Sequence, residues 1–512
     1  MKISRMVSLA ALTLLTACRA GSVAPALGGE GSVRVTRSEM SRQLPAYILG
    51  FNVNNARGPS WREPEALAAA VNLQPLNLRY PGGTVGNYWD WETGWFMEGT
   101  NPPHGLGNIE PTINKLEDFK VLIDATGAEP VYMLNMLTSD LEHQMNMLRH
   151  ARAIGLKVRL VELGNEFYLP REGYMERFPA PEDYAREANE WIKTIKAEFP
   201  ATRVGVVGAH ERGTQGRRNN WNKPVLDAIE GADALTVHPY AGPNLAEEMD
   251  TLLEGTGLVP ETRRDKRKSG MVAPEPYQQA QKEAMASAEG PGYALSAPFG
   301  AWDHFKATRT KLPEGMTFWF TEYGIFDRVG AIHSTWLHGL FVAAMSAAYI
   351  EGDNVELLCI HQLVGQPAFT AILTGQDPFA RYMDYAETKR FSLSAMGVTI
   401  RHLCDALRGA TRVNGLAFDP NPVMTSRTGT PWPTLVGWTI DSAEGRKAMI
   451  MNLGSQPADL AIAGSPLDGF ETIDRIASDP GRRITGIEAV DRTGKPLENV
   501  LILPPFSITN LF

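Results

Sequence analysis

One pattern occurs eight times along the sequence: a short apolar run is followed by a segment with helical periodicity, although the residues themselves are not repeated. Repeated strand–helix units are typical of a parallel sheet with helices on its outside. Apolar residues are nearly continuous within the runs, as expected for strands that are buried on both faces. Eight units predict a closed α/β barrel of the (β/α)8 type rather than an open sheet. The predicted strands are Tyr47–Val53, Leu76–Tyr80, Pro130–Leu134, Val158–Leu163, Arg203–Gly208, Ala234–His238, Thr317–Thr321 and Val355–Ile360.

After residue 408 the pattern changes. Short alternating runs are separated there by Gly, Pro, Asp and Asn, which is typical of an antiparallel β-sandwich. We therefore expect a (β/α)8 TIM barrel over residues 32–408, with a long insertion near 241–315, followed by a β-sandwich over 409–512. The segment Ser32–Thr36 has strand character and could instead join the sandwich. The predicted sandwich strands are Leu435–Ile440, Ala448–Asn452, Ala458–Ile462, Ile484–Val490, Val500–Leu503 and Phe506–Asn510.

The N-terminus carries two cations and then the apolar run Met6–Leu15, which is too short to span a bilayer. This pattern predicts a signal peptide over residues 1–17, with a flexible tether over 18–31. The letters LTAC, ending at Cys18, resemble a bacterial lipoprotein box, and the resemblance implies lipidation of Cys18. Ordinary cleavage near Ala17 or Ala20 is the alternative. The expected location is the bacterial cell envelope, in the periplasm or on the outer membrane, with secretion as the alternative.

Net charge bears on the class of binding partner, and cysteine content bears on whether disulfides form. The chain has a net charge of −9, and loss of residues 1–17 would make it −11. No large basic face is implied, which argues against a nucleic-acid partner. Apart from Cys18, the chain contains only Cys359 and Cys404, and their apolar surroundings favour two buried free thiols over a disulfide. A membrane contact is expected only through the N-terminal lipid, and the oligomeric state stays open.

Two glutamates follow strands that face each other across the predicted barrel. Glu166 comes after the fourth strand and Glu322 after the seventh. Barrel enzymes place their chemistry at this end of the strands. A glycosidic bond is hydrolysed with retention when one carboxylic acid protonates the leaving oxygen and a second, about 5 Å away, attacks the anomeric carbon. A single solvated glutamate at a strand end is common, but the pair predicts a retaining glycoside hydrolase.

The same positions resemble a known group. Asn-Glu after strand 4 and Glu after strand 7 resemble the clan A retaining glycoside hydrolases. The stretch LRYPGGTVGNYWDW (Leu78–Trp91) resembles the family 51 α-L-arabinofuranosidases, and ELGNE (Glu162–Glu166) equally resembles the heparanase-like β-glucuronidases of family 79. The ending LPPFSITNLF (Leu503–Phe512) is similar to the last strand of the sandwich that accompanies such barrels. The resemblance implies a polysaccharide or oligosaccharide substrate, with no cofactor or metal.

Residue roles follow from the resemblance. Glu166 would be the acid/base, and Glu322 the nucleophile. Asn165 would contact the hydroxyl next to the anomeric carbon. Arg79 and Tyr240 would hold Glu322 ionised, while Glu166 would keep its proton near neutral pH. A surface ion pair is the alternative for Arg79.

Further candidates for sugar contact lie at other strand ends and in the loop after strand 2. Each has a structural alternative: a core histidine, a loop cap or local aromatic packing. They are His238, Asn54, Asn135, Trp89 and Trp91.

Three functions remain open at this stage. The first is a glycosidase resembling the α-L-arabinofuranosidases, and the second is a glycosidase resembling the β-glucuronidases. The third is a glycan-binding lipoprotein without activity, which would need neither carboxylate. A metal-dependent barrel hydrolase is less consistent with the sequence, because the first strand lacks a His-x-His pattern. The sequence leaves the sugar, the linkage and endo or exo action open.

Overall fold

The computed structural model describes residues 32–103, 105–211, 213, 215–256, 275–327, 330–365, 369–374 and 389–512. Within them, eight parallel strands form a sheet that closes on itself where β9 pairs with β11. The expected (β/α)8 barrel is therefore confirmed. The barrel strands are β2 (Leu49–Asn52), β3 (Asn77–Tyr80), β6 (Glu129–Leu134), β7 (Leu160–Leu163), β8 (Arg203–Val207), β9 (Ala234–Thr236), β11 (Thr317–Ile325) and β12 (Val355–Ile360).

Helices surround the barrel, and local sequence explains several of their ends. The helix α6 begins at Pro181, where a missing N–H costs nothing, and Asp183 accepts a hydrogen bond from the Ala180 N–H. The helix α3 ends at Gly127, which takes the left-handed conformation that glycine favours. The surrounding helices are α1 (Pro64–Leu73), α3 (Leu116–Thr126), α4 (Leu141–Ala153), α6 (Pro181–Glu198), α8 (Asn222–Ala228), α12 (Gly290–Thr308), α13 (Trp336–Ile350) and α14 (Ala395–Leu407).

Shorter elements lie in the connections between strands and helices. Between β9 and α12, the described residues form a two-residue strand, which pairs with the end of β11, and two helices. One of these helices matches the helical pattern near residues 276–287. The shorter elements are α2 (Gly83–Gly86), β4 (Trp89–Asp90), β5 (Trp95–Phe96), α5 (Glu172–Arg177), α7 (Gly216–Asn219), β10 (Tyr240–Ala241), α9 (Ala246–Leu253) and α11 (Glu275–Ala286).

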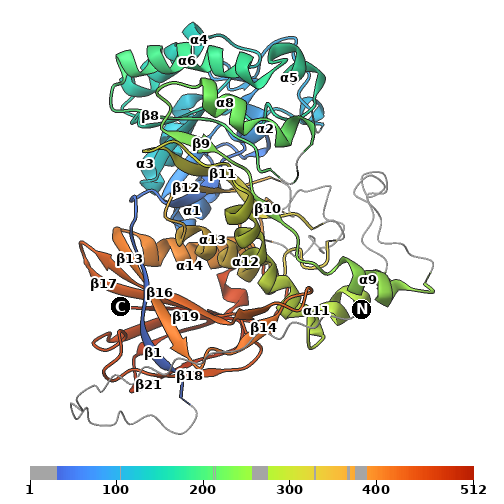
Figure 1. The fold of residues 1–512 in the computed structure, drawn as a ribbon, viewed down its shortest axis with the longest axis vertical. Helices are drawn as coiled ribbons and strands as arrows, with labels where there is room; N and C mark the ends of the chain where they lie inside the picture. The colour runs from blue at the N-terminus through green and yellow to red at the C-terminus, as the bar shows by residue number, and fades with distance from the viewer. Residues whose placement is uncertain are drawn as a thin grey trace, which may run out of the picture.

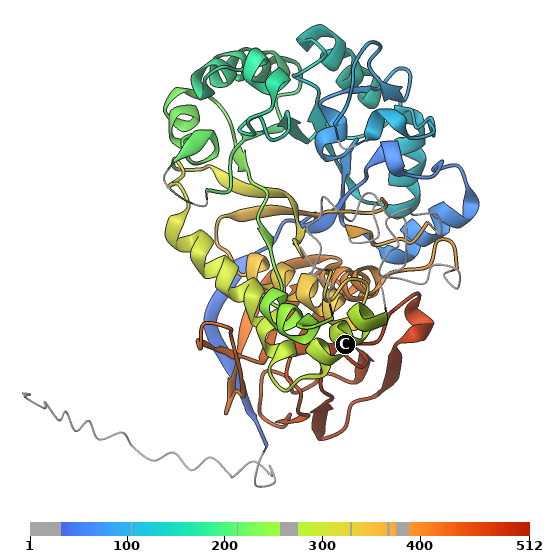
Figure 2. The same ribbon diagram turned by 90° about the vertical axis from the view of Figure 1, so that its right-hand side faces the viewer.

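The C-terminal region forms a seven-stranded antiparallel sheet at the other end of the molecule's long axis from the barrel (Figure 1). Its strand order is β1, β13, β16, β17, β22, β19, β20. Figures 1 and 2 show β1, in blue, lying beside the orange strands of this sheet. The strands are β1 (Arg34–Gln43), β13 (Ala410–Asp419), β16 (Leu435–Ser442), β17 (Gly445–Asn452), β19 (Thr472–Ala477), β20 (Asp491–Pro496) and β22 (Ser507–Leu511).

Both faces of this sheet are apolar, and alternate residues of β17 show why. Met449 and Met451 join the hydrophobic cluster of the barrel, whereas Ala448 and Ile450 join a second cluster on the opposite face. That second cluster includes residues of the small sheet formed by β18 (Ala458–Ala461) and β21 (Val500–Leu503). A further hairpin, β14 (Val423–Thr425) with β15 (Pro431–Pro433), contacts α12. The antiparallel sheet is therefore covered by the barrel on one side and by a smaller sheet on the other.

The helix α13 lies between the barrel and the antiparallel sheet, and every one of its residues is buried (Figure 1). Its Trp336 Nε1 donates a hydrogen bond to the Phe506 carbonyl, and Asn510 Nδ2 donates to the His402 carbonyl of α14. A helix that is buried all round needs apolar residues on every face. The run WLHGLFVAAMSAAYI meets that need.

Several expectations differ from the structure or fall outside it. The predicted strand Ile484–Val490 is absent from the described sheets: Gly486 has φ 149°, and a 3-10 turn follows over Ile487–Ala489. The expected lipidation site at Cys18 lies outside the described residues and stays a prediction. Cys359 and Cys404 are buried free thiols, as expected. None of the helices in the described ranges is long and apolar enough to cross a membrane.

Candidate active site

Glu322 lies on β11 near the barrel axis and is 6% exposed. Two side chains from other strands hold its carboxylate. Arg79 Nη1, from β3, lies 3.2 Å from Glu322 Oε1, and the Tyr240 hydroxyl donates to Oε2 at 3.0 Å. Tyr240 is placed there because β10 pairs with the end of β11, with Tyr240 opposite Gly324. The structure thus brings together the three residues that the resemblance assigned to the nucleophile.

Arg79 is fully buried, which excludes a surface ion pair. A buried guanidinium must be paired and hydrogen-bonded to persist. Its Nε contacts Glu162 Oε2 at 2.5 Å, and its two remaining nitrogens donate to Asn52 Oδ1 at 2.8 Å and Asn165 Oδ1 at 2.9 Å. Burial alone would lower the pKa of Arg79, but Glu162 and Glu322 outweigh burial and raise it. Arg79 is therefore a permanent positive charge beneath the nucleophile.

Glu166 follows β7 and faces Glu322 across one histidine. The Tyr168 hydroxyl donates to Glu166 Oε1 at 2.6 Å, and His238 Nδ1 lies 3.1 Å from the same oxygen. That nitrogen is also 3.8 Å from Glu322 Oε2. Two oxygens at these distances from one nitrogen can be no more than about 7 Å apart, which admits the roughly 5 Å separation of retaining glycosidases. His238 therefore bridges the two carboxylates instead of filling a core position.

The contacts of the second ring nitrogen of His238 determine which nitrogen carries the proton in the neutral imidazole. Its Nε2 lies 3.1 Å from Thr321 Oγ1, and that hydroxyl donates to Glu162 Oε1 at 2.8 Å. A hydroxyl has one proton to donate, so Thr321 must accept from His238 Nε2–H. The tautomer with a proton on Nε2 follows from this chain. Protonation of Nδ1 then makes an imidazolium that faces both carboxylates.

The pKa directions agree with this geometry. Burial acts to raise the pKa of Glu322, but His238, His361 and Arg79 outweigh it and lower the pKa. Burial likewise acts on Glu166, yet His238 and Tyr168 lower its pKa. Burial would lower the pKa of His238, and the two carboxylates instead raise it. These directions differ from the expectation that Glu166 keeps its own proton. Without a ligand they favour an ionised Glu166 with the shared proton on His238.

The dependence of kcat/KM on pH should be bell-shaped. A lowered pKa keeps Glu322 ionised, so the acid limb should lie below the ordinary value of 4.5, where falling pH protonates the nucleophile. A raised pKa keeps the proton on His238, so the alkaline limb should lie above 6.5, where rising pH removes it. Initial rates across pH 3–10 would test this, with His238→Gln as the variant whose alkaline limb moves. A flat profile over that range would contradict the paired roles.

Some buried polar atoms near the glutamates have no hydrogen-bond partner within the described part of the chain. They include Asn165 Nδ2 and Asn54 Oδ1. The other ends of both amides are fixed, because Asn165 Oδ1 accepts from Arg79 and Asn54 Nδ2 donates to Gln362 Oε1. His361 Nδ1 lies 3.8 Å from Glu322 Oε2. Unsatisfied buried donors and acceptors are costly unless a ligand completes them, and a polyhydroxylated ligand could do so.

The glycines after β3 serve the nucleophile. A Cβ at Gly83 would clash with Glu322 Oε1, so only glycine lets the loop pass this close to the carboxylate. The Gly83 N–H donates to Asn52 Oδ1, the same oxygen that accepts from Arg79. The loop therefore belongs to the network beneath Glu322.

Three expected sugar contacts are used in local packing. Trp89 is 2% exposed, and its Nε1 donates to the Tyr80 hydroxyl. Trp91 lies between the rings of His143 and His150 on α4, with centroid distances of 5.7 and 5.3 Å. Asn135 caps its own loop and donates to the Trp89 carbonyl. No contact found within the described ranges joins these three residues to either glutamate.

Sequence reasoning missed four residues that the network requires: Glu162, Asn52, Thr321 and Tyr168. Glu162 and Thr321 lie inside the predicted strands Val158–Leu163 and Thr317–Thr321, so a search for polar residues that follow strands does not reach them. A usable signal did exist for Glu162, because an acid within a buried strand needs a buried cation as its partner. Arg79 in another buried strand is such a cation.

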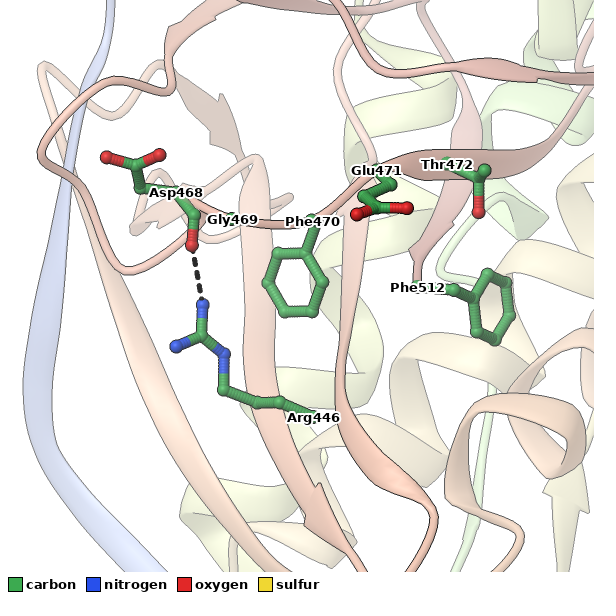
Figure 3. A pocket seen from close by; sticks show the side chains of 7 residues that line it. All are labelled: Arg446, Asp468, Gly469, Phe470, Glu471, Thr472 and Phe512. Atoms are coloured by element: carbon green, nitrogen blue, oxygen red, sulfur yellow. Dashed lines mark hydrogen bonds between the residues drawn. The ribbon is translucent and has the colours of Figure 1, made fainter.

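A separate cavity of about 450 Å³ lies on the C-terminal sheet (Figure 3). The Arg446 guanidinium lies 4.7 Å over the Phe470 ring and donates to the Asp468 carbonyl at 2.9 Å. Glu471 and Phe512 complete much of its lining. The cavity contains none of the residues that surround Glu166 and Glu322.

Comparison with known proteins finds solved structures with a similar fold. Neither a protein-family model nor a curated protein sequence matches the chain. The GH51 arabinofuranosidase from Xanthomonas axonopodis pv. citri matches with a TM-score of 0.62 at 14% identity, over 94% of this chain and 99% of that one. The α-L-arabinofuranosidase from Thermotoga maritima, solved with arabinose, gives a TM-score of 0.60 at 16% identity over the same shares. A 4-O-α-L-rhamnosyl-β-D-glucuronidase from Fusarium oxysporum 12S, solved with Rha-GlcA, gives a TM-score of 0.50 at 12% identity, over 94% of this chain and 99% of that one.

At these identities the similarity concerns the fold. The chain shares its (β/α)8 barrel and C-terminal antiparallel sheet with glycoside hydrolases of the clan A type. The expected resemblance to the arabinofuranosidases and to a glucuronidase is confirmed at that level. Function must be argued from the site itself.

Proposed function

We propose that this chain is a retaining glycoside hydrolase that cleaves O-glycosidic bonds of an oligosaccharide or polysaccharide. The observation that carries the proposal is the pair of carboxylates around His238, with Glu166 at 3.1 Å and Glu322 at 3.8 Å from one nitrogen. A glycan-binding protein has no need to bury two carboxylates this close together. Two such groups repel each other and persist only because His238 and Arg79 compensate for their charge.

In the first step Glu322 attacks the anomeric carbon, and the bond to the leaving oxygen breaks. The proton on His238 Nδ1 first passes to Glu166, 3.1 Å away, and Glu166 delivers it to the leaving oxygen, which leaves Glu166 ionised and His238 neutral. A covalent glycosyl–Glu322 ester results. In the second step Glu166 removes a proton from water, the water oxygen bonds to the anomeric carbon, and Glu322 leaves as a carboxylate. Configuration is retained because two inversions occur.

The remaining residues position these groups. Arg79 keeps Glu322 anionic as it leaves, and Tyr240 orients one of its oxygens. Asn165 Nδ2, which has no partner within the described chain, would donate to the hydroxyl next to the anomeric carbon. We propose activity like that of the α-L-arabinofuranosidases, since the greater fold similarity is to that group. A β-glucuronidase is the second candidate, because the fold is also similar to that of a rhamnosyl-glucuronidase.

Glu166→Ala should separate substrates by their leaving groups. Without the acid, unactivated glycosides should lose about 10²–10⁴-fold in kcat/KM, whereas 2,4-dinitrophenyl glycosides should be cleaved at nearly the wild-type rate in the first step. Rates on aryl glycosides of graded leaving-group acidity would measure this. Glu166→Gln is the matched control, since it keeps the shape but not the proton. An equal loss on all leaving groups would contradict the role of Glu166.

A further inference from the structure

Arg218 lies close to the proposed acid/base without being part of the network beneath Glu322. It is on α7, in the connection after β8, at the same end of the barrel as both glutamates. Its guanidinium carbon lies 4.8 Å from the centroid of the Tyr168 ring. The hydroxyl of that tyrosine donates to Glu166 Oε1 at 2.6 Å. Arg218 and Glu166 are therefore linked by one aromatic side chain.

The neighbouring arginine shows what a structural role looks like here. Arg217 donates to three main-chain carbonyls, those of Phe167, Phe178 and Pro179, and so ties α7 to the loop after Glu166. Arg218 is half-buried, and no carboxylate among the described residues lies within ion-pair distance of it. An arginine that is partly removed from water, lies over an aromatic ring and has no carboxylate within ion-pair distance is suited to bind an anion.

The charge of Arg218 has a cost for acid catalysis unless an anion neutralises it. Its positive charge acts to lower the pKa of both Glu166 and Tyr168. A general acid works best when its pKa is close to the working pH, so a free cation beside it is unfavourable. A carboxylate on the bound substrate would cancel this field and return the proton from His238 to Glu166. The planar guanidinium matches a carboxylate in geometry as well as in charge.

We propose that Arg218 binds a carboxylate on the leaving-group side of the substrate, so that the preferred substrate has a uronic acid as its leaving sugar. This inference rests on the proposed role of Glu166, because the leaving group must lie next to the acid that protonates it. Arg218 is then a specificity-determining residue, and neutral leaving groups are poorer substrates.

Paired aryl glycosides can test the inference. The sugar is the one that a panel of aryl arabinofuranosides, glucuronides and glucosides identifies as cleaved. Its 3-carboxyphenyl glycoside is compared with the methyl ester of the same compound, which has the same shape without the charge. The measured quantity is the ratio of kcat/KM for carboxylate over ester. Dividing the wild-type ratio by that of a variant cancels the difference in leaving-group chemistry.

Arg218→Gln should lower the ratio about tenfold, as expected for the loss of one charge-assisted hydrogen bond. Arg218→Lys should retain part of the preference, and raising the salt concentration should reduce the wild-type ratio. Arg217→Gln is the matched control: it should change the rates on both compounds together and leave their ratio unchanged.

An unchanged ratio in Arg218→Gln, with both compounds still cleaved, would overturn this inference and leave the proposed function standing. The inference would also be overturned if Arg218→Gln lost a wild-type preference for glucuronides over neutral glycosides when both carry the same neutral leaving group. The anion that Arg218 binds would then lie on the other side of the scissile bond. Failure of the wild-type protein to cleave any member of the panel would overturn the proposed function, and this inference with it.

Discussion

Glu322→Ala should abolish turnover, with a loss on the order of 10⁴-fold or more in kcat, because no other group can form the covalent intermediate. Added azide should restore cleavage of activated aryl glycosides and give a glycosyl azide of inverted configuration. Azide can do so because the shortened side chain leaves a space next to Arg79, whose charge attracts the anion. Rates with and without azide, together with NMR of the product, would measure both effects.

Two controls make this result specific. Azide added to Glu166→Ala should give a product of retained configuration, since the nucleophile is still present and azide replaces water in the second step. Tyr240→Phe should lower the rate far less than Glu322→Ala, because it removes one hydrogen bond to the carboxylate. A Glu322→Ala protein with more than a tenth of wild-type activity on natural substrates would contradict the assignment.

Deleting residues 501–512 should make the protein insoluble or destabilise it by at least about 4 kcal/mol. These residues include β22, which pairs with β17 on one side and β19 on the other, and all five of its residues are buried. The deletion opens two sheet edges and exposes the face that packs on α13 and α14. Soluble yield and thermal unfolding would measure the effect.

The matched control for this deletion is Phe512→Ala, which changes a side chain that is 37% exposed and leaves β22 intact. It should fold and unfold almost as the wild type does. A chain that ends at Arg408 and is soluble, monomeric and fully active would instead show that the C-terminal sheet is an independent module.

The barrel could be predicted because its strands are buried on both faces and most helices between them have one apolar stripe, with the fully buried α13 as an exception. The predicted run at Val158–Leu163 begins only two residues before β7. The run at Ile484–Val490 has the same alternation as a true strand, yet Gly486 breaks it, and hydrogen bonds to residues near α13 replace a sheet partner. Alternation alone cannot distinguish these cases, because the partner strand lies far away in the chain.

The site was predictable where function and strand ends coincide, as for Glu166 and Glu322. It was not predictable where a side chain acts through another one. The link from His238 through Thr321 to Glu162 depends on three strands meeting in the barrel interior. Burial likewise decided between sugar stacking and packing for Trp89, and burial is a property of the folded loop rather than of its composition.

The pairing of β1 with β13 has a consequence for how the chain folds. Arg34 of β1 and Asp419 of β13 form an ion pair across 385 residues of sequence, and the whole barrel lies between them. Contacts that close so long a loop are slow to form and must follow the collapse of what they enclose. During synthesis β1 therefore emerges first and remains without its partner until the barrel is complete. Its sequence, RVTRSEMSRQ, is mostly polar, so the unpaired strand can remain in water without pairing with a second chain and aggregating.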